Sequence, residues 1–326
     1  MYATVMTEFG GPEVLTAAEV RNPPVPEGWV AVKLEAAALN WHDVLVRRGQ
    51  YGSPLPHTPG ADGAGIRSDT GEKVLVVPSL WWGGDESAPG PRWEILGDRR
   101  PGTYAERVVV PSGSVVPKPA GWDWHGAAAL PLVGVTTYRA LFTRGRLREG
   151  ESLLVLGAGG GVATMAVMLG AAVGARVIVT SSSQAKIDQA VGLGAAGGVL
   201  YTNDGWPDAA RQLANDAAGF DMVLDSVGTW ESSVDSAKHG GRVVVLGASR
   251  SGTGVLDVRQ FYFGQYDLLG TTMGSPADFA ELLGFLERYS VPPPPVGRVF
   301  PLDGAVDAHE YLESGMGFGK VVLSMS

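Results

Sequence analysis

From about residue 120 onward, short apolar runs alternate with Ala-rich stretches of helical length. The runs read LLVLG, RVIVT, GGVLY, DMVLD and RVVVLG. Strands that are apolar on both faces are buried on both faces, and helix-length segments between such strands indicate βαβ units. The pattern therefore predicts an α/β fold with a doubly wound parallel sheet of the Rossmann type, over residues 121–270.

The first 120 residues follow a different pattern. Short apolar runs at 29–34, 72–77 and 106–110 are separated by Gly and Pro at short intervals, which predicts a β-rich module with long loops. The last segment, 271–326, contains the amphipathic stretch FAELLGFLERY, four prolines at 292–295, and two strand-like runs, GRVFPL and GKVVLSM. A proline run cannot lie inside a strand, so we expect it to form a stiff crossing between two elements.

Composition narrows the class of protein. A chain of 326 residues that is 45% apolar and 18% charged is typical of a soluble protein with two domains. The net charge of -9 and the lack of a dense Lys/Arg run argue against nucleic acid as a partner. We find no long apolar stretch and no leader pattern, so we expect no membrane association and a cytoplasmic location. With no cysteine, a metal would have to be held by His, Asp and Glu alone.

The stretch SLLVLGAGGGVATMAVMLGAAVGARVIVT predicts a strand, a glycine turn, a helix and a second strand. Glycines at such a turn let the backbone approach a pyrophosphate, whose charge then lies at the helix N-terminus. One register places Ala158, Gly160 and Ala163 at the G-x-G-x-x-G spacing. A flexible turn without a ligand is the alternative, but the flanking strands and helix favour a dinucleotide. The candidate pyrophosphate-binding residues are Ala158, Gly159, Gly160, Gly161 and Val162.

The end of the second strand indicates which dinucleotide is bound. NAD-specific proteins usually place an acidic residue there, but no acidic residue lies between Glu151 and Asp188. The strand instead ends in Ser181 and Ser182, with Lys186 shortly after. Hydroxyls donate to a 2′-phosphate and a lysine neutralises it, so we expect NADP(H). A helix cap and a solvated lysine would explain the same residues, and both explanations are compatible with phosphate binding.

A series of motifs carries a resemblance to a known family. VLVRRGQY, PGADGAG, GTYAERVVVP, AAALPLVGVTTYRAL, the glycine turn, VIVTSSSQAK and GKVVL occur in this order along nearly the whole chain. Together they resemble the medium-chain dehydrogenase/reductase superfamily, and most closely its zinc-free, quinone-oxidoreductase-like members, many of whose relatives are called zinc-type alcohol dehydrogenase-like. The resemblance implies a GroES-like catalytic domain formed by 1–120 and 271–326, an inserted Rossmann domain, a small-molecule substrate, and a homodimer paired through the Rossmann domains.

The resemblance also implies roles for individual residues. Ser181, Ser182 and Lys186 match positions that bind the 2′-phosphate in NADP-specific relatives, and Tyr201 matches a tyrosine of the adenosine pocket. Thr136, in GVTTY, matches a threonine that touches the nicotinamide half of the cofactor. The remaining cofactor-binding candidates lie after strands or in the returning segment, and they are Ser226, Val227, Gly247, Ala248, Ser249 and Lys320.

The positions that hold the catalytic zinc in metal-dependent relatives carry other residues here. They read Asn40, Ala61, and an apolar residue at Leu132 or Val133, none of which binds zinc. The lobe that holds a structural zinc is replaced by SLWWGGDESAPGPRWEILG, and the five histidines show no i, i+4 pair on an expected helix. We therefore expect no zinc, and we expect Asp62 to hold the turn between its glycines.

Without a metal, hydrogen-bond donors must stabilise the charge that develops on the substrate oxygen. The resemblance points to the loop LNWHDVLVRRGQY, where Asn40 and Tyr51 are the candidate catalytic donors. A conjugated acceptor delocalises that charge, which favours reduction of a quinone or an α,β-unsaturated carbonyl by NADPH. The alternatives are a zinc-independent alcohol or aldehyde dehydrogenase and a catalytically silent NADP-binding sensor. Each of these residues also has a structural explanation. Asn40 could cap a turn, Asp43 could pair with Arg47, and Tyr51 could serve only to pack its loop.

Overall fold

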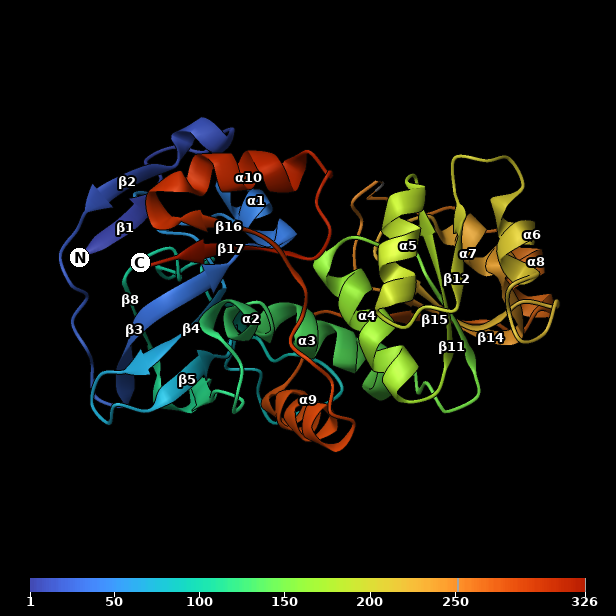
Figure 1. The fold of residues 1–326 in the computed structure, drawn as a ribbon, viewed down its shortest axis with the longest axis horizontal. Coiled ribbons are helices and arrows are strands. Elements are labelled where there is room, and N and C mark those ends of the chain that lie inside the picture. The colour runs from blue at the N-terminus through green and yellow to red at the C-terminus, as the bar shows by residue number, and fades with distance from the viewer. Residues whose placement is uncertain (251, 326) are drawn as a thin grey trace. The chain divides into compact units, whose positions relative to one another are not determined.

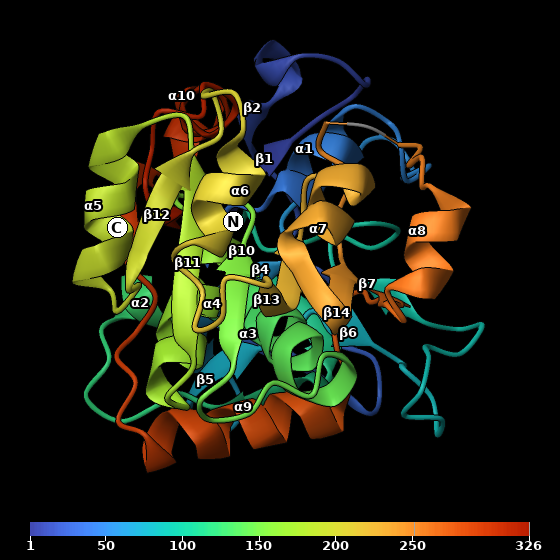
Figure 2. The same ribbon diagram turned by 90° about the vertical axis from the view of Figure 1, so that its right-hand side faces the viewer.

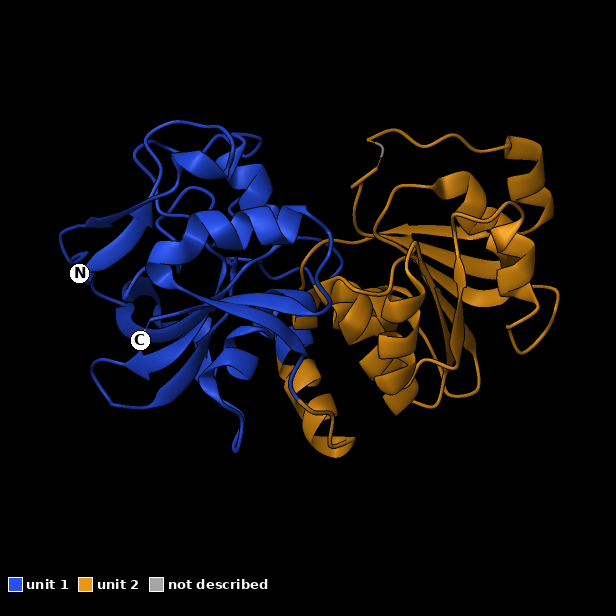
Figure 3. Cartoon of the chain, turned by 45° about the horizontal axis from the view of Figure 1, so that its top comes forward, with its two compact units in different colours: residues 1–133, 275–279, 293–326 blue, residues 134–274, 280–292 orange. Residues whose placement is uncertain are grey.

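The computed structural model describes residues 1–250 and 252–325, and the chain forms two compact units (Figures 1 and 3). The first unit, blue in Figure 3, consists of residues 1–133, 275–279 and 293–326. The second, orange in Figure 3, consists of residues 134–274 and 280–292. The chain thus leaves the first unit after residue 133 and again after residue 279, and it returns at residues 275 and 293. Each unit is described by itself.

The second unit contains a six-stranded sheet in the order β12-β11-β10-β13-β14-β15, in which every pair is parallel. The chain starts in the middle, adds two strands on one side and then three on the other, which is the order of a dinucleotide-binding Rossmann sheet. The predicted fold class is confirmed. The strands are β10 (Ser152–Val155), β11 (Arg176–Ser181), β12 (Gly197–Leu200), β13 (Phe220–Asp225), β14 (Ala237–Val245) and β15 (Asp267–Gly270).

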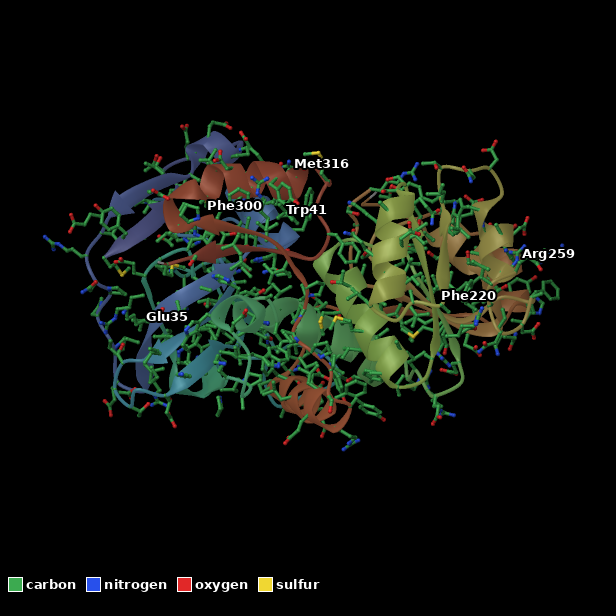
Figure 4. All side chains as sticks on the ribbon, viewed as in Figure 1. Glu35, Trp41, Phe220, Arg259, Phe300 and Met316 are labelled. Carbon is green, nitrogen blue, oxygen red and sulfur yellow. The ribbon has the colours of Figure 1, made fainter. Side chains whose placement is uncertain are left out.

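Helices connect these strands, and Figure 2 shows α5 and α8 on opposite sides of the sheet's strands. All four residues of β10 are buried, as its unbroken apolar sequence predicts. Phe220, labelled in Figure 4, belongs to the apolar core of this unit together with Leu154 and Val243. The helices are α4 (Gly161–Ala172), α5 (Gln184–Gly192), α6 (Trp206–Arg211), α7 (Trp230–Ser236) and α8 (Val258–Phe263), with the π-helical turn η3 (Arg139–Arg144).

The first unit is built on a seven-stranded sheet in the order β16-β17-β3-β4-β5-β9, with β8 also paired to β3. All of its pairs are antiparallel except β16 with β17. The strands are β3 (Trp29–Ala38), β4 (Asp62–Arg67), β5 (Lys73–Val76), β8 (Arg107–Pro111), β9 (Val115–Pro117), β16 (Val296–Pro301) and β17 (Lys320–Ser324). The long strand β3 is central because β17, β4 and β8 all pair with it.

Smaller elements complete the first unit. Two short antiparallel pairs are formed by β1 (Tyr2–Val5) with β2 (Thr16–Glu19) and by β6 (Ser79–Leu80) with β7 (Glu94–Ile95). Phe300, labelled in Figure 4, lies in its core with Leu39 and Leu323. The helical elements are α1 (Trp41–Arg47), α2 (Trp124–Ala128), α10 (Ala305–Glu313), η1 (Pro12–Val14), η2 (Ser112–Ser114) and η4 (Leu302–Gly304).

Two helices span the boundaries between the units, α3 (Pro131–Tyr138) and α9 (Pro276–Arg288). The four prolines at 292–295 follow α9 and precede β16, as expected for a stiff crossing. Among the residues that the structure describes, none of the helices combines the length and the apolar character that a bilayer crossing requires.

Candidate active site and cofactor site

Three polar side chains of the first unit form a buried cluster. The Nζ of Lys320 lies 2.6 Å from Asn40 Oδ1 and 3.0 Å from Asp62 Oδ2. The amide Nδ2 of Asn40 also donates to Asp62 Oδ2, at 2.9 Å. The three residues are exposed by 5% or less, so nearly all of their polar atoms depend on each other and on the backbone. We call these three residues the Lys320 cluster.

The register of the sheet brings these residues together although they are far apart in sequence. Asn40 follows the end of β3, and Asp62, the first residue of β4, is paired with Ala38 near that same end. On the other side of β3, Leu39 N–H donates to Val321 O, which places the first residue of β17, Lys320, beside it. One end of the central strand therefore gathers an amide, a carboxylate and an ammonium group.

Asp62 does more than hold a turn. It is fully buried, and its second carboxylate oxygen, Oδ1, accepts the backbone N–H of Leu132 at 2.7 Å. Burial raises the pKa of Asp62, while the Lys320 charge and the hydrogen bonds from Asn40 and Leu132 oppose this rise. A buried carboxylate is tolerated only when it is paired and hydrogen-bonded in this way.

The cluster lies where the sequence places the positions of a catalytic metal. The resemblance matches Asn40, Ala61, and Leu132 or Val133 to zinc ligands of metal-dependent relatives, and Asn40, Ala61 and Leu132 lie in or next to the cluster. Across residues 1–250 and 252–325, no group of three or more His, Cys, Asp or Glu side chains is arranged to hold a metal ion. The cation that the structure shows at this place is the Lys320 ammonium.

Two of the residues with expected roles are found in a different environment. The resemblance implies that Lys320 reaches the cofactor, but its ammonium is buried and bonded to Asn40 and Asp62. The Nδ2 hydrogens of Asn40, the expected donors to substrate, are directed at Asp62 and, at a long 3.4 Å, at Ala38 O. Tyr51 follows α1, and 41% of its surface is exposed.

His42 forms charged contacts with two carboxylates beside Tyr51. Its Nε2 lies 2.5 Å from Asp98 Oδ1 and its Nδ1 lies 3.5 Å from Asp43 Oδ1. Its ring packs edge-on against the Tyr51 ring, with 4.8 Å between centroids. Burial by itself lowers the pKa of His42, but the two carboxylates outweigh it and raise this pKa to about 9. His42 is therefore an imidazolium at neutral pH.

The predicted pair of Asp43 with Arg47 is wrong. Asp43 Oδ2 instead accepts the Asn40 backbone N–H at 2.8 Å and the Tyr104 hydroxyl at 3.1 Å. Tyr104 in turn contacts His309 Nε2 at 3.2 Å, and Arg47 Nη1 donates to His309 Nδ1 at 3.1 Å. Burial lowers the pKa of His309 to about 4, so the ring is neutral. Because Arg47 donates to Nδ1, the single ring proton of His309 lies on Nε2. The network fixes the start of α1, where Asn40 lies.

Sequence reasoning missed Asp98, Tyr104 and His309 because each contacts the site from a segment distant in sequence. Tyr104 belongs to the motif GTYAERVVVP, which was a signal that it had a defined role. Asp98 lies in a loop without such a motif, and nothing in the sequence links it to His42.

In the second unit, the glycine turn connects β10 to α4 as predicted. Gly157 has a φ of +105°, a conformation that favours glycine, and it precedes the first residue of the predicted register, the buried Ala158. Around Gly157 and Gly160, none of the described heavy atoms lies within 4 Å of an ideal Cβ position. The backbone is therefore open to a ligand at these two residues. Gly160 caps α4, whose first N–H groups have no partner within the helix.

The residues expected at the 2′-phosphate lie at the end of β11. Ser181 is buried, and its Oγ accepts the Ser183 N–H at 3.1 Å, whereas Ser182 is exposed. Lys186 is half-buried on the first turn of α5, and burial lowers its pKa. Tyr201 follows β12, is 44% exposed, and donates its N–H to Ser181 O at 3.0 Å. Ser182, Lys186 and Tyr201 thus surround the carboxyl ends of neighbouring strands.

The other candidates of this unit lie at the carboxyl ends of β13 and β14. The buried Asp225 accepts the N–H groups of Val227 and Gly228 at 2.7 and 2.8 Å, which shapes the turn after β13. Ser249 Oγ donates to Ser226 O at 3.3 Å and joins the two turns. The structure thus brings together Ser226, Val227, Gly247, Ala248 and Ser249. Thr136 is buried in α3, with its hydroxyl 3.7 Å from Met273 Sδ.

Comparisons with known proteins agree with this architecture. The family model of the alcohol dehydrogenase GroES-like domain matches residues 26–120, and that of the zinc-binding dehydrogenase matches residues 161–288. A quinone oxidoreductase of Mus musculus is 30% identical over 99% of this chain and 97% of its own. An NADPH-dependent alkenal/one oxidoreductase of Arabidopsis thaliana is 31% identical over 99% of this chain and 79% of its own. A crystal structure of an NAD-dependent alcohol dehydrogenase is 38% identical to this chain and has a TM-score of 0.94. The match covers 100% of both chains.

A Rossmann-ordered sheet, a GroES-like β-rich unit and these matches define the class of protein. The chain belongs to the medium-chain dehydrogenase/reductase superfamily, as its motifs indicated. Within that superfamily it is a quinone-oxidoreductase-like member, and it is an oxidoreductase.

Proposed function

We propose that the protein reduces quinones or α,β-unsaturated carbonyls with NADPH and without zinc. The observation that carries the proposal is the Lys320 cluster, in which an ammonium group is bonded to both Asn40 and Asp62. The resemblance matches Asn40 of this cluster to a zinc ligand of metal-dependent relatives. The names of two relatives, quinone oxidoreductase and NADPH-dependent alkenal/one oxidoreductase, support this substrate class.

The donor set at the cluster does not fit a zinc ion. Zinc requires three or four convergent ligands among thiolates, imidazoles and carboxylates, and here the candidates are one amide and one carboxylate. Both are already bonded to a cation, and a second cation bound to the same two groups would lie a few ångströms from the Lys320 ammonium. Repulsion between the two charges in a buried site opposes such binding.

The same cluster can strengthen the Asn40 amide as a hydrogen-bond donor. The Lys320 ammonium withdraws electron density from Asn40 Oδ1 at 2.6 Å, which makes the Nδ2 hydrogens more acidic. The bond from Nδ2 to Ala38 O is 3.4 Å long and therefore weak, so it costs little to exchange it for a substrate oxygen. Asn40 remains our candidate for stabilising negative charge on that oxygen, with Lys320 and Asp62 as positioning residues.

Tyr51, which packs against His42, is the candidate proton donor because its phenol is partly exposed, whereas the hydroxyl of Tyr104 is fully buried. Burial and the Asp98 charge raise the pKa of Tyr51, which keeps the phenol protonated at neutral pH. Two neutral donors provide only modest stabilisation of an oxyanion. A quinone or enone suits such donors because its charge is delocalised, whereas an isolated alkoxide requires a stronger electrophile.

The cofactor side of the proposal depends on the second unit. NADPH supplies the hydride when it is bound. The open backbone at Gly157 and Gly160 and the N-terminus of α4 fit a pyrophosphate, and Ser182 and Lys186 fit a 2′-phosphate. One structural relative is called NAD-dependent, so the preference for NADPH rests on the absence of an acidic residue after β11 in this chain. We further propose a homodimer paired through the second units.

A panel of acceptors tests the proposal. NADPH oxidation is followed with benzoquinones, enals, enones and saturated aldehydes, each with and without a metal chelator. We expect turnover of quinones or conjugated carbonyls that the chelator does not change. Loss of activity on chelation would contradict the metal-free mechanism, and turnover of aldehydes alone would support a zinc-independent alcohol or aldehyde dehydrogenase. Tight NADPH binding without turnover of any acceptor would support a sensor.

A further inference from the structure

The first unit contains a pocket, none of whose lining residues belongs to the Lys320 cluster. It has a volume of about 390 Å³ and is lined by residues of β1, the segment between β2 and β3, the loop at 56–58, and the segment 100–109 that includes the start of β8. This volume is within the usual range for small-molecule sites, about 300–1,000 Å³. The pocket is therefore large enough for a small ligand of its own.

The walls of this pocket are apolar and stiff. Five of its lining residues are prolines, which have fixed φ angles and no N–H group, and Trp29 adds an aromatic surface. The prolines are Pro23, Pro24, Pro26, Pro56 and Pro101. Because such a wall is already rigid, little conformational entropy of the protein is lost when a ligand binds. Its apolar surface favours a hydrophobic ligand body.

Three arginines also line the pocket, and two of them lack a counter-charge. Arg100 is bonded to Glu94 Oε1 at 2.5 Å and stacks over Trp81 at 4.7 Å. For the guanidinium groups of Arg21 and Arg107, the described part of the chain offers no hydrogen bond or ion pair. The Nε of Arg107 is fully buried and has no acceptor, which is costly for a charged donor.

The charge of the pocket is opposite to that of the protein. The whole chain carries a net charge of -9, yet no acidic residue is found among the described residues that line the pocket. A guanidinium fork matches the geometry of a carboxylate, and a bound carboxylate would supply the acceptor that the buried Nε of Arg107 lacks. Apolar walls and unpaired guanidinium groups together select a ligand with both properties.

We propose that this pocket binds a small carboxylic acid with a hydrophobic body, whose carboxylate pairs with Arg107 and Arg21 and whose body packs against Trp29 and the prolines. The proposal goes beyond the reductase activity, because none of the pocket's lining residues is in the Lys320 cluster or at the glycine turn. It makes the first unit a ligand-binding unit in its own right.

Binding of 2-naphthoate, measured by calorimetry on the full chain, tests the proposal. The neutral 2-naphthol has the same ring system without the carboxylate, and inorganic phosphate supplies an anion without a hydrophobic body. We expect naphthoate to bind with a stoichiometry of one per chain and at least ten-fold more tightly than either of the other two. Equal binding of naphthoate and naphthol, binding of phosphate as tight as that of naphthoate, or no binding of naphthoate at millimolar concentration would overturn the proposal.

Variants locate the site. Arg107→Met and Arg21→Met keep most of the aliphatic stem and remove the guanidinium. Each should weaken the binding of naphthoate at least ten-fold. Arg288→Met, which changes an exposed arginine of α9, and Lys186→Met, at the expected 2′-phosphate position, should leave it unchanged. Arg21 is exposed, so its variant tests the proposal even if Arg107→Met fails to fold. Unchanged affinity in both pocket variants would place naphthoate elsewhere and refute the assignment.

Discussion

Replacing Lys320 by methionine removes the positive charge from the Lys320 cluster. The substitution keeps a long apolar side chain and leaves Asp62, which is fully buried, without its ammonium partner 3.0 Å away. At an effective dielectric constant of about 20, two unit charges at this distance attract by about 5 kcal/mol. Removing one member of a buried pair typically costs about 3–5 kcal/mol of folding free energy. We expect Lys320→Met to destabilise the protein by an amount in this range.

The measurement is urea denaturation followed by circular dichroism, with two matched variants. Lys320→Met combined with Asp62→Asn removes both charges, keeps an acceptor for the Leu132 N–H, and should recover most of the lost stability. Lys33→Met changes an exposed lysine of β3 and should alter the free energy of unfolding by less than about 0.5 kcal/mol.

The effect of Lys320→Met should also depend on pH. Without the ammonium, burial raises the pKa of Asp62 further above its ordinary value, so the carboxyl becomes protonated and neutral as the pH falls. A group whose folded pKa is raised contributes stability that is present at low pH and lost as the pH rises. The deficit should therefore be smaller at pH 5 than at pH 8. A cost below about 1 kcal/mol at pH 8, or a double variant no more stable than the single one, would refute the assigned ion pair.

Three further predictions concern other parts of the molecule. His42 has a pKa of about 9 in the folded protein against 6.5 unfolded, so its charge contributes about 3 kcal/mol below pH 6.5 that is lost as the pH rises toward 9. His42→Gln should therefore cost more stability at pH 6 than at pH 10, and an equal cost at both would contradict the double ion pair. The double variant Ser182→Ala, Lys186→Met should weaken the binding of NADPH by roughly ten-fold or more, while the affinity for NADH changes little. Equal weakening of both affinities in calorimetry would refute the 2′-phosphate assignment. Phe263→Asp, on the exposed face of α8, should convert a dimer to a monomer in analytical ultracentrifugation, whereas Met316→Asp in the first unit should not; a dimer that survives Phe263→Asp would exclude α8 from the interface.

The strands of the second unit were largely predictable from sequence, and the one that was missed has a physical explanation. Unbroken apolar runs marked the buried strands β10, β11, β13 and β14, because a strand covered on both faces must be apolar throughout. Strand β15 was missed because its sequence, DLLG, is too short to show a period. It is a strand because β14 offers it hydrogen-bonding partners from Arg242 to Val245.

The sequence predicted individual candidate residues, but it did not predict the interactions between them. The motifs identified Asn40 and Lys320 and marked Asp62 as the acid after a lost ligand. None of these patterns indicated that the three side chains bond to each other, since 22 residues separate Asn40 from Asp62 and 258 separate Asp62 from Lys320. The same holds for His42, whose pKa depends on Asp98 from a distant loop.

The sequence by itself determined the fold class, the family and the position of the glycine turn, because periodicity, motifs and spacing are local properties of the chain. Only the tertiary structure decided how the side chains of Asn40, Asp62 and Lys320 are paired. The register of β4 and β17 on either side of β3 brings Asp62 and Lys320 to Asn40. Because both charged groups are buried there, each needs the opposite charge of the other as a partner. Interaction between charges depends on distance and on exclusion of water, and both are set by strand pairing between segments far apart in the sequence.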